Sequence, residues 1–345
     1  MSNLTYVTQL KERKLSNCLE QVNSIAITGH IRPDGDCVGA CLGLCTYLLD
    51  QFPDRKVDVF LDPIPQEFRF LKYADRIRQE EEHAGVYDLC IALDCSDLDR
   101  LNQGSRIFKE AGHTLCIDHH VTNSGYGDVS VVYPQSSSAS ELLYYLIRDT
   151  ELFGNGLISY DCAQALYMGI VHDTGVFKHS NTRLEAMTAA GELIEYGLNT
   201  EKIINDTFFK KTYIQNQILG KALLESMLIL DGKMIFSVLY QKDFDFFGAD
   251  PSDTNGIIDQ LRITEGIHVA MFLYENPNGD FKVSLRSDEM VDVSVIAQEF
   301  GGGGHIRAAG CTVTGDMRDI VMNIAERVEL QLEKTTRDMT IASAI

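Results

Sequence analysis

Aspartate and histidine side chains gather in four short segments of the chain. Three of these segments lie at the carboxyl ends of predicted strands, and the fourth ends a predicted helix. Because ligands of open α/β sheets bind outside the carboxyl ends of the strands, these side chains are placed for chemistry. The four segments are His30-Ile-Arg-Pro-Asp34-Gly-Asp36, Asp94, Asp118-His119-His120 and His172-Asp173-Thr174-Gly175.

The residue types suit a pair of divalent cations. Two carboxylates only two residues apart oppose joint ionisation unless a cation lies between them. Carboxylate and imidazole donors without a thiolate suit Mn²⁺ or a similar ion. Two ions about 3.5–4 Å apart can share a bridging carboxylate and activate a water to attack a phosphoester. The candidate metal ligands are His30, Asp34, Asp36, Asp94, His119 and Asp173.

Each segment taken alone has a simpler explanation. The first could cap a helix within a solvated turn, and a single histidine after a strand is most often a hydrogen-bonded structural group. The fourth could close a helix, with Gly175 as the stop. The metal hypothesis therefore depends on the four segments meeting at one edge of a sheet.

A second candidate site lies in the glycine run Gly301–Gly304 and the residues that follow it. Successive glycines let backbone N–H groups approach an anion closely, and His305 can donate to a phosphate. Arg286 ends a predicted strand just upstream and offers a fork of N–H donors. The alternatives are a flexible hinge for the glycines and an ordinary surface position for the arginine.

The elements that must position these residues alternate between strand and helix in the first half of the chain. Continuous apolar strands separated by helical patterns predict a parallel sheet that is covered on both faces. The expected strands are 24–28, 56–61, 87–94, 114–118 and 129–133.

The second half predicts a smaller sheet of mixed direction with its own helices. The expected fold class is therefore α/β, with an N-terminal parallel-sheet domain and a smaller mixed-sheet α/β domain joined by a helical linker. The helical pattern over 201–230 is long enough for that linker, residues 243–247 read as a surface loop, and the chain after Lys334 reads as a frayed tail. The expected division is a domain over 1–195, a linker over 196–230, a domain over 231–335 and a tail over 336–345.

The composition of the 345 residues limits the partners. Thirty basic against 50 acidic residues give a net charge of −20, which argues against a protein that grips long duplex DNA through its phosphates. No apolar run predicts a transmembrane helix, and the polar first 16 residues lack the core of a signal peptide. The nine scattered cysteines read as reduced core thiols, with Cys37, Cys41 and Cys45 on one helix face. These features predict a cytoplasmic protein without a membrane partner.

In combination the motifs resemble those of the DHH phosphoesterase family, in its form with a DHH-associated C-terminal domain. The four acidic segments match in order, and the glycine motif GGGH-x-x-A-A-G matches Gly302 to Gly310. The resemblance spans about residues 20–330. Ala40 stands where the family often has serine, and this chain has four glycines where the family motif has three.

The resemblance implies a role for each matching residue. His30, Asp34 and Asp94 would hold one Mn²⁺, and Asp94 would bridge to a second Mn²⁺ in a site between the domains. His120 would contact the scissile phosphate or donate a proton, and Asp118 would orient the histidine pair. The second ion would be held by Asp36, Asp94, His119 and Asp173, and the substrate's terminal phosphate or nucleotide by Arg286, Gly303, Gly304 and His305.

Among the branches of the family, the length and the two domains resemble the nanoRNase group, which trims very short RNA and often dephosphorylates 3′-phosphoadenosine 5′-phosphate. The resemblance therefore implies a Mn²⁺-dependent phosphodiesterase acting on RNA of a few nucleotides, with Mg²⁺ or Co²⁺ as substitutes. Three alternatives stay open: a cyclic di-AMP or linear dinucleotide phosphodiesterase, an exopolyphosphatase, and a non-catalytic nucleotide-binding module. The sequence also leaves open the direction of trimming, the base preference and the oligomeric state, a homodimer included.

Overall fold

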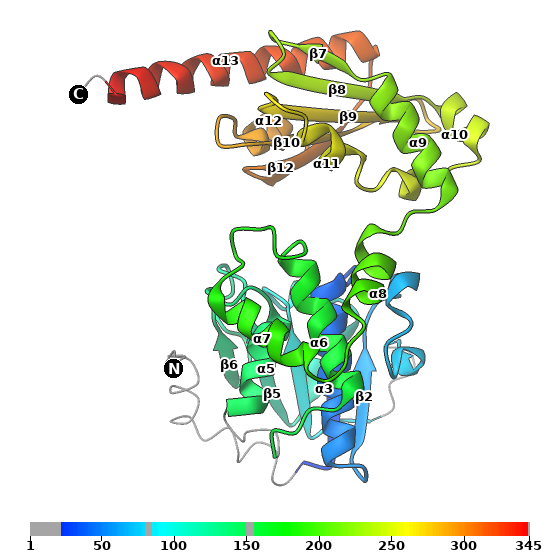
Figure 1. Cartoon of the computed structure of the whole chain (residues 1–345), viewed down its shortest axis with the longest axis vertical. Helices are drawn as coiled ribbons and strands as arrows, with labels where there is room; N and C mark the ends of the chain where they lie inside the picture. The colour runs from blue at the N-terminus through cyan, green and yellow to red at the C-terminus, as the bar shows by residue number, and fades with distance from the viewer. Residues whose placement is uncertain (1–21, 80–84, 150–154, 344–345) are drawn as a thin grey trace. The chain divides into compact units, whose positions relative to one another are not determined.

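The structure is a computed structural model that describes residues 22–79, 85–149 and 155–343. The chain divides into two compact units, Met1–Lys210 and Lys211–Ile345 (Figure 1). Each unit has its own sheet and its own core. In the part of the chain that the structure describes, no helix is both long enough and apolar enough to cross a bilayer.

Unit 1 is built on a parallel sheet of six strands. The strands are β1 (Ser24–Thr28), β2 (Lys56–Phe60), β3 (Ile77–Arg78), β4 (Leu89–Leu93), β5 (His113–Asp118) and β6 (Val129–Val132). Their order in the sheet is β3-β2-β1-β4-β5-β6. The chain moves outward from β1 to β3 and then returns to the other side of β1 at β4, so the direction of winding reverses between β1 and β4. Such a reversal opens a crevice at the carboxyl ends of the two strands, where ligands of this architecture bind.

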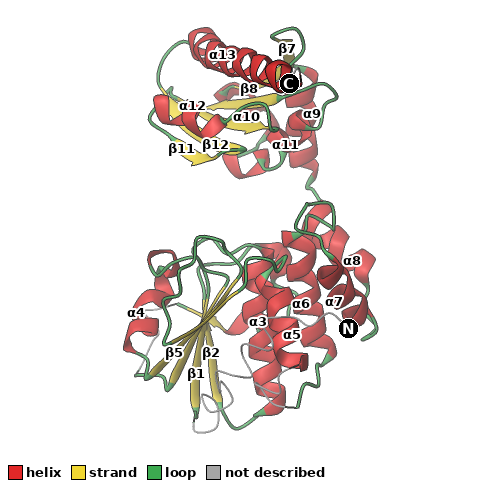
Figure 2. Ribbon diagram, turned by 90° about the vertical axis from the view of Figure 1, so that its left-hand side faces the viewer, coloured by secondary structure: helices red, strands yellow, loops and turns green. Residues whose placement is uncertain are grey.

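Helices cover both faces of this sheet, which explains why its central strands are apolar throughout. Figure 2 shows α3, α5, α6 and α7 on one face and α4 on the other. The larger core lies under the first group and a smaller core lies under α4. The helices are α3 (Gly35–Gln51), α4 (Gln103–Glu110), α5 (Ala139–Asp149), α6 (Tyr160–Asp173), α7 (Leu184–Ile194) and α8 (Thr200–Ile204), followed by a π-helical turn at Asn205–Phe209.

Helices α3 and α6 pack unusually closely because glycines face each other across their contact. A Cβ atom added at Gly39 would lie 2.6 Å from the carbonyl oxygen of Ala165 and 3.0 Å from the Cα of Gly169. A Cβ added at Gly43 would lie 2.8 Å from a methyl carbon of Leu166. Both helices carry site residues at their ends, so this close packing fixes the distance between the first and fourth acidic segments.

Unit 2 is built on a mixed sheet of six strands. The strands are β7 (Met227–Ile229), β8 (Met234–Leu239), β9 (Val269–Glu275), β10 (Phe281–Ser287), β11 (Gly303–His305) and β12 (Ala308–Val313). The order is β11-β12-β10-β9-β8-β7, and only the β8–β9 pair is parallel among the strands described. One face packs on α12 (Val293–Glu299) and α13 (Met317–Ser343), and the other packs on α9 (Tyr213–Leu224), α10 (Gln241–Phe247) and α11 (Ile257–Arg262).

The predicted fold class, a parallel-sheet α/β domain followed by a smaller mixed-sheet domain, is confirmed. The single helix expected over 201–230 is wrong. Thr212 starts a new helix there, because its hydroxyl accepts from the N–H of Gln215 while the Gln215 side chain accepts from the N–H of Thr212. That helix ends at Leu224, and the apolar residues beyond it form strand β7 instead.

Two smaller expectations also differ from the structure. Residues 243–247 belong to helix α10 rather than to a surface loop, since the Asp243 carboxylate accepts from the N–H of Tyr240 at 2.8 Å and Gly248 ends the helix at a φ of 63°. The chain after Lys334 continues α13 to Ser343 instead of fraying at that point.

We predict that Gly39→Ala destabilises unit 1 by about 1–3 kcal/mol, because the added methyl group would meet backbone atoms of α6 that cannot move independently. Gly191→Ala is the matched control, since Gly191 is also within a helix but a Cβ there meets nothing within 4 Å. This control should gain about 0.5–1 kcal/mol from reduced backbone entropy in the unfolded chain. Urea unfolding, with amide hydrogen exchange of α3 and α6, measures both. Equal stability of the two variants would contradict the close-packing argument.

Candidate active site

The carboxyl ends of three neighbouring strands bring the first three acidic segments together. His30 follows β1, Asp94 follows β4, and Asp118 is the last residue of β5. These strands are adjacent in the sheet, so their ends share one edge on the two sides of the point where the winding reverses. Asp173, the last residue of α6, joins them there, with its carboxylate 3.5 Å from His119 Nε2.

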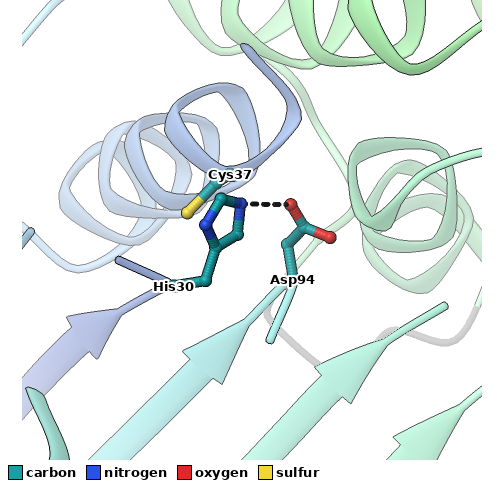
Figure 3. A group of neighbouring side chains, drawn as sticks. All are labelled: His30, Cys37 and Asp94. Carbon is teal, nitrogen blue, oxygen red and sulfur yellow. Dashed lines mark ion pairs between the residues drawn. The ribbon is translucent and has the colours of Figure 1, made fainter. Parts of the chain in front are cut away.

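His30 presents one ring nitrogen to this edge. Its Nδ1 lies 2.7 Å from the carbonyl oxygen of Ile31, which takes a ring N–H and leaves Nε2 as the free donor of a lone pair. The Nε2 atom lies 3.5 Å from Asp94 Oδ2 (Figure 3) and 3.6 Å from Asp34 Oδ1. These separations are too long for good hydrogen bonds but suit ligands that share an ion.

His119 occupies the corresponding position on the other side of Asp94. Its Nε2 lies 3.4 Å from Asp94 Oδ1, 3.5 Å from Asp173 Oδ2 and 3.9 Å from Asp36 Oδ2. The two oxygens of Asp94 thus face different histidines, Oδ2 toward His30 and Oδ1 toward His119. This is the arrangement that a carboxylate bridging two cations requires.

The Asp94 side chain also carries the signs of an unsatisfied ligand. The residue is 2% exposed, and its Oδ1 has no hydrogen-bond partner. Its backbone has a φ of 53°, a left-handed conformation that costs a residue with a Cβ on the order of 1 kcal/mol or more. The residues of this edge therefore fit divalent cations, which would satisfy the orphaned oxygen.

The first segment is held by helix starts. Asp34 caps α3, with its Oδ1 accepting from the N–H groups of Asp36 and Cys37 at 3.1 Å each. The carboxylate of Asp36 accepts from the first turn of α5, from Ala139 N at 2.6 Å and from Ser140 N at 2.9 Å. Helix N-termini favour negative charge, so α5 fixes the Asp36 carboxylate at the metal edge.

Gly35, between the two carboxylates, has no room for a side chain. A Cβ there would lie 2.2 Å from the Cγ of His172, whose ring packs edge-on against Phe68 and Phe208. Burial lowers the pKa of His172 to about 4, so the ring stays neutral and its Nε2 contacts the hydroxyl of Thr207 at 2.9 Å. His172 therefore packs against the site as a neutral side chain.

The histidine pair depends on Asp118, and Asp118 depends on a residue that the sequence analysis missed. The carboxylate of Asp118 contacts His120 Nδ1 at 2.8 Å and accepts from the N–H of His119 at 2.8 Å. Its other oxygen accepts from the side-chain amide of Asn123 at 2.7 Å, and Asn123 also donates to the carbonyl of Cys95 at 3.0 Å. Asn123 follows His120 by three residues in a turn, which is the signal that could have pointed to it.

The carboxylates give the site a negative charge that neutral histidines do not balance. Burial alone would lower the pKa of His30, but Asp34 and Asp94 outweigh it and raise that pKa to about 12. Burial also opposes a charged His119, and Asp94 raises the pKa of that histidine to about 10. Burial raises the pKa of Asp173 to about 6. Without cations, His30, His119 and Asp173 therefore bind protons more tightly than usual, which offsets the charge of the carboxylates. Divalent cations would displace those protons.

The glycine segment of unit 2 forms a hairpin whose glycines have different tasks. A Cβ at Gly302 would lie 2.1 Å from the carbonyl oxygen of Gly310, and one at Gly304 would lie 2.5 Å from that of Ala308. A Cβ at Gly303 would meet nothing within 4 Å. Gly302 and Gly304 are therefore needed for the packing of β11 against β12, whereas the space where a Gly303 side chain would stand is open.

The other two predicted substrate residues share one face of this sheet. Ala308 on β12 pairs with His305 on β11 and with Arg286 on β10. Directly paired residues point to the same face, so the small Ala308 side chain lies between the two. Arg286 Nε lies 3.4 Å from the carboxylate of Asp259, an ion pair that the sequence analysis did not foresee. An anion bound by Arg286 would compete with that exposed carboxylate.

The structure thus brings the six candidate metal ligands to one edge of unit 1. It places the four candidate substrate residues on one hairpin and its neighbouring strand in unit 2. The individual assignments of ligand and catalytic roles remain predictions. The arrangement in unit 1 could hold two cations side by side, with the His120–Asp118 pair next to them.

Two family domains match the chain. The DHH family, N-terminal domain, matches residues 24–170, and the DHHA1 domain matches residues 231–334. A protein from Bacillus subtilis named bifunctional oligoribonuclease and PAP phosphatase NrnA is 27% identical over 303 residues, which cover 87% of this chain and 92% of that protein. A protein of the same name from Thermus thermophilus is 29% identical over 327 residues, covering 94% and 95%.

A solved structure shows the same fold over nearly the whole chain. An exopolyphosphatase-related protein from Bacteroides fragilis superposes with a TM-score of 0.85 at 23% identity, covering 97% of this chain and all of that one. The fold, the site and the matching domains define an enzyme of the metal-dependent phosphoesterase class. The chain belongs to the DHH family, in its form with a DHHA1 domain, as the motifs predicted.

We predict that Asn123→Leu lowers kcat by about 10- to 100-fold, the usual effect of losing a partner that orients a metal-site group. Asp118 raises the pKa of His120 through a hydrogen bond that Asn123 holds in place. Loosening that bond lowers the pKa of His120, so the alkaline fall of kcat moves to lower pH. Steady-state kinetics across pH measure this.

The control is Ser124→Ala, an exposed neighbour in the same turn. It should keep the kcat and the pH profile of the unchanged enzyme. An unchanged kcat in Asn123→Leu, or an alkaline limb that moves to higher pH, would contradict the assigned role of Asn123.

Proposed function

We propose that this enzyme hydrolyses the phosphodiester bonds of very short RNA, two to five nucleotides long, with two Mn²⁺ ions, and that it also removes the 3′-phosphate of 3′-phosphoadenosine 5′-phosphate. The observation that carries the metal part of this proposal is Asp94, whose two buried oxygens face two different histidines. The similarity to named oligoribonucleases over about nine-tenths of the chain supports the substrates.

The two ions would share Asp94. His30, Asp34 and Asp94 would hold one ion, and Asp36, Asp94, His119 and Asp173 would hold the other. When bound, such a pair of ions lowers the pKa of a shared water and offsets charge on the phosphoryl oxygens. Oxygen and imidazole donors favour Mn²⁺, with Mg²⁺ or Co²⁺ as substitutes.

The chain's own residues would supply the remaining chemistry. His120 donates a ring N–H to the Asp118 carboxylate, and this hydrogen bond raises the pKa of His120, which favours the protonated ring. Since Nδ1 is engaged by Asp118, a proton on Nε2 is free to pass to the leaving oxygen. Asp118 and Asn123 would hold the ring in that orientation.

Unit 2 would bind the end of the substrate. Arg286 and His305 on one face of the sheet would contact a terminal phosphate, and the open space at Gly303, with Gly304 beside it, would let that phosphate approach closely. The overall charge of −20 opposes long polyanions, so a grip on one terminus suits a substrate of a few nucleotides.

We predict that Asp94→Asn lowers kcat by at least about 10³-fold at saturating Mn²⁺, because the ions lose the group that they share. Asp99→Asn is the matched control, since Asp99 is an exposed carboxylate five residues further along, and it should keep full activity. Turnover of a linear RNA dinucleotide measures both. Full activity of Asp94→Asn would contradict the metal assignment.

A substrate panel tests the rest of the proposal. Linear di-adenylate and 3′-phosphoadenosine 5′-phosphate should be turned over with kcat/KM well above that for cyclic di-AMP, because only the first two present a terminal phosphate or an open end to unit 2. Preference for cyclic di-AMP or for polyphosphate would move the enzyme to another branch of the family. Metal binding without turnover of any phosphoester would leave a nucleotide-binding module.

A further inference from the structure

A thiol faces the His30 half of the candidate metal centre. Cys37, in the first turn of α3, is fully buried, and its Sγ lies beside the His30 ring (Figure 3). One ligand atom from each of His30, Cys37 and Asp94 lies within 4.8 Å of the other two. A Cβ added at Gly29 would come within 2.3 Å of the Cys37 sulfur, so Gly29 leaves the space that the sulfur occupies.

The other two donors are free to share an ion with this sulfur. The Nδ1 atom of His30 is taken by the carbonyl of Ile31, which leaves Nε2 available. Asp94 is 2% exposed, and the oxygen that it turns toward this half of the site, Oδ2, lies 3.5 Å from His30 Nε2. Asp34, whose Oδ1 lies 3.6 Å from the same nitrogen, adds a more exposed carboxylate next to His30. A nitrogen, a sulfur and one carboxylate thus converge on one small volume, and the Asp34 carboxylate lies next to the His30 nitrogen.

We propose that His30, Cys37, Asp94 and Asp34 form a tetrahedral site for a thiophilic divalent cation such as Zn²⁺. This inference rests on the proposed metal centre and describes a second way in which that centre binds a metal ion. On binding, the thiol gives its proton to solvent and the thiolate donates a lone pair to the ion. Zinc binds thiolate, imidazole and carboxylate ligands in this geometry, with about 2.3 Å to sulfur and about 2.0–2.2 Å to nitrogen and oxygen.

The two modes of metal binding differ in the coordination positions that they leave open for water and substrate. Mn²⁺ prefers oxygen and nitrogen ligands, so it leaves the thiol protonated and keeps positions for water and phosphate. Zn²⁺ with four protein ligands has a closed coordination shell, which is the mark of structural rather than catalytic sites. Cys37 therefore makes the enzyme sensitive to inhibition by Zn²⁺ and acts as a determinant of metal selectivity.

The test is a Co²⁺ titration of the metal-free, full-length protein, because a thiolate bound to Co²⁺ gives a charge-transfer absorption in the near ultraviolet. The unchanged protein should show this band, and Cys37→Ser should lose it while keeping the weaker visible bands of Co²⁺ bound to the other ligands. Competition by Zn²⁺ should reveal an affinity at least about tenfold lower in Cys37→Ser. Cys41→Ser, one helical turn away and also buried, should keep both the band and the affinity.

These readouts need no turnover, so they separate this inference from the proposed reaction. A charge-transfer band that persists in Cys37→Ser, or that is absent from the unchanged protein, overturns the proposal. Loss of every Co²⁺ band in both Cys37→Ser and Cys37→Ala overturns it as well, since the thiol would then support the whole centre. Relief of Zn²⁺ inhibition of hydrolysis in Cys37→Ser, with Mn²⁺ affinity unchanged, would support it further.

Discussion

The carboxylates that meet at one edge of the unit 1 sheet are the constraint on which the rest of this structure depends. Carboxylates that are buried together repel one another and lose their hydration, so they stay in place only if the fold and a counter-charge hold them. The start of α5 fixes the Asp36 carboxylate, and the turn after β5 fixes Asp118 through Asn123. Asp94 is held in a left-handed backbone conformation. The shared burial of the carboxylates and the left-handed backbone of Asp94 cost stability, and the ions that the edge would bind explain both.

The packing around this edge follows from the same constraint. Glycines at positions 39 and 169 let α3 and α6 approach until their ends deliver Asp36 and Asp173 to one place. A Cβ added at Gly169 would lie 2.8 Å from the carboxylate of Asp36 itself. The contact between α3 and α6 therefore also sets the geometry of the site. A substitution that alters this packing would move the candidate ligands as well.

Much of this arrangement could be predicted from the sequence. Apolar strands that end in an acid or a histidine place those groups at one sheet edge, which is why the sequence predicts that His30, Asp94 and His119 lie together. Asn123 was missed because nothing in the pattern shows which side chain a turn aims inward. The sequence predicts Cys37 as a core thiol on a helix face, and it is buried as expected. Its proximity to His30 depends on the missing side chain at Gly29, which no periodicity reveals.

The second unit shows the same limit. The sequence alone treats the members of the glycine run alike, whereas the structure crowds Gly302 and Gly304 against β12 and leaves space at Gly301 and Gly303. The helix expected over 201–230 is broken at Thr212, whose reciprocal hydrogen bonds with Gln215 start a new helix. The apolar periodicity of the sequence hides this local signal. Local capping chemistry decides where helices end, and periodicity decides only where they are favourable.

The central claim is that Asp94 joins two ions into one centre, and electron paramagnetic resonance of the Mn²⁺-loaded protein tests it most directly. The account predicts two Mn²⁺ per chain with the exchange-coupled spectrum of a bridged pair, and loss of that coupling in Asp94→Asn. A spectrum of isolated Mn²⁺ ions only, at any loading of the unchanged protein, would contradict it.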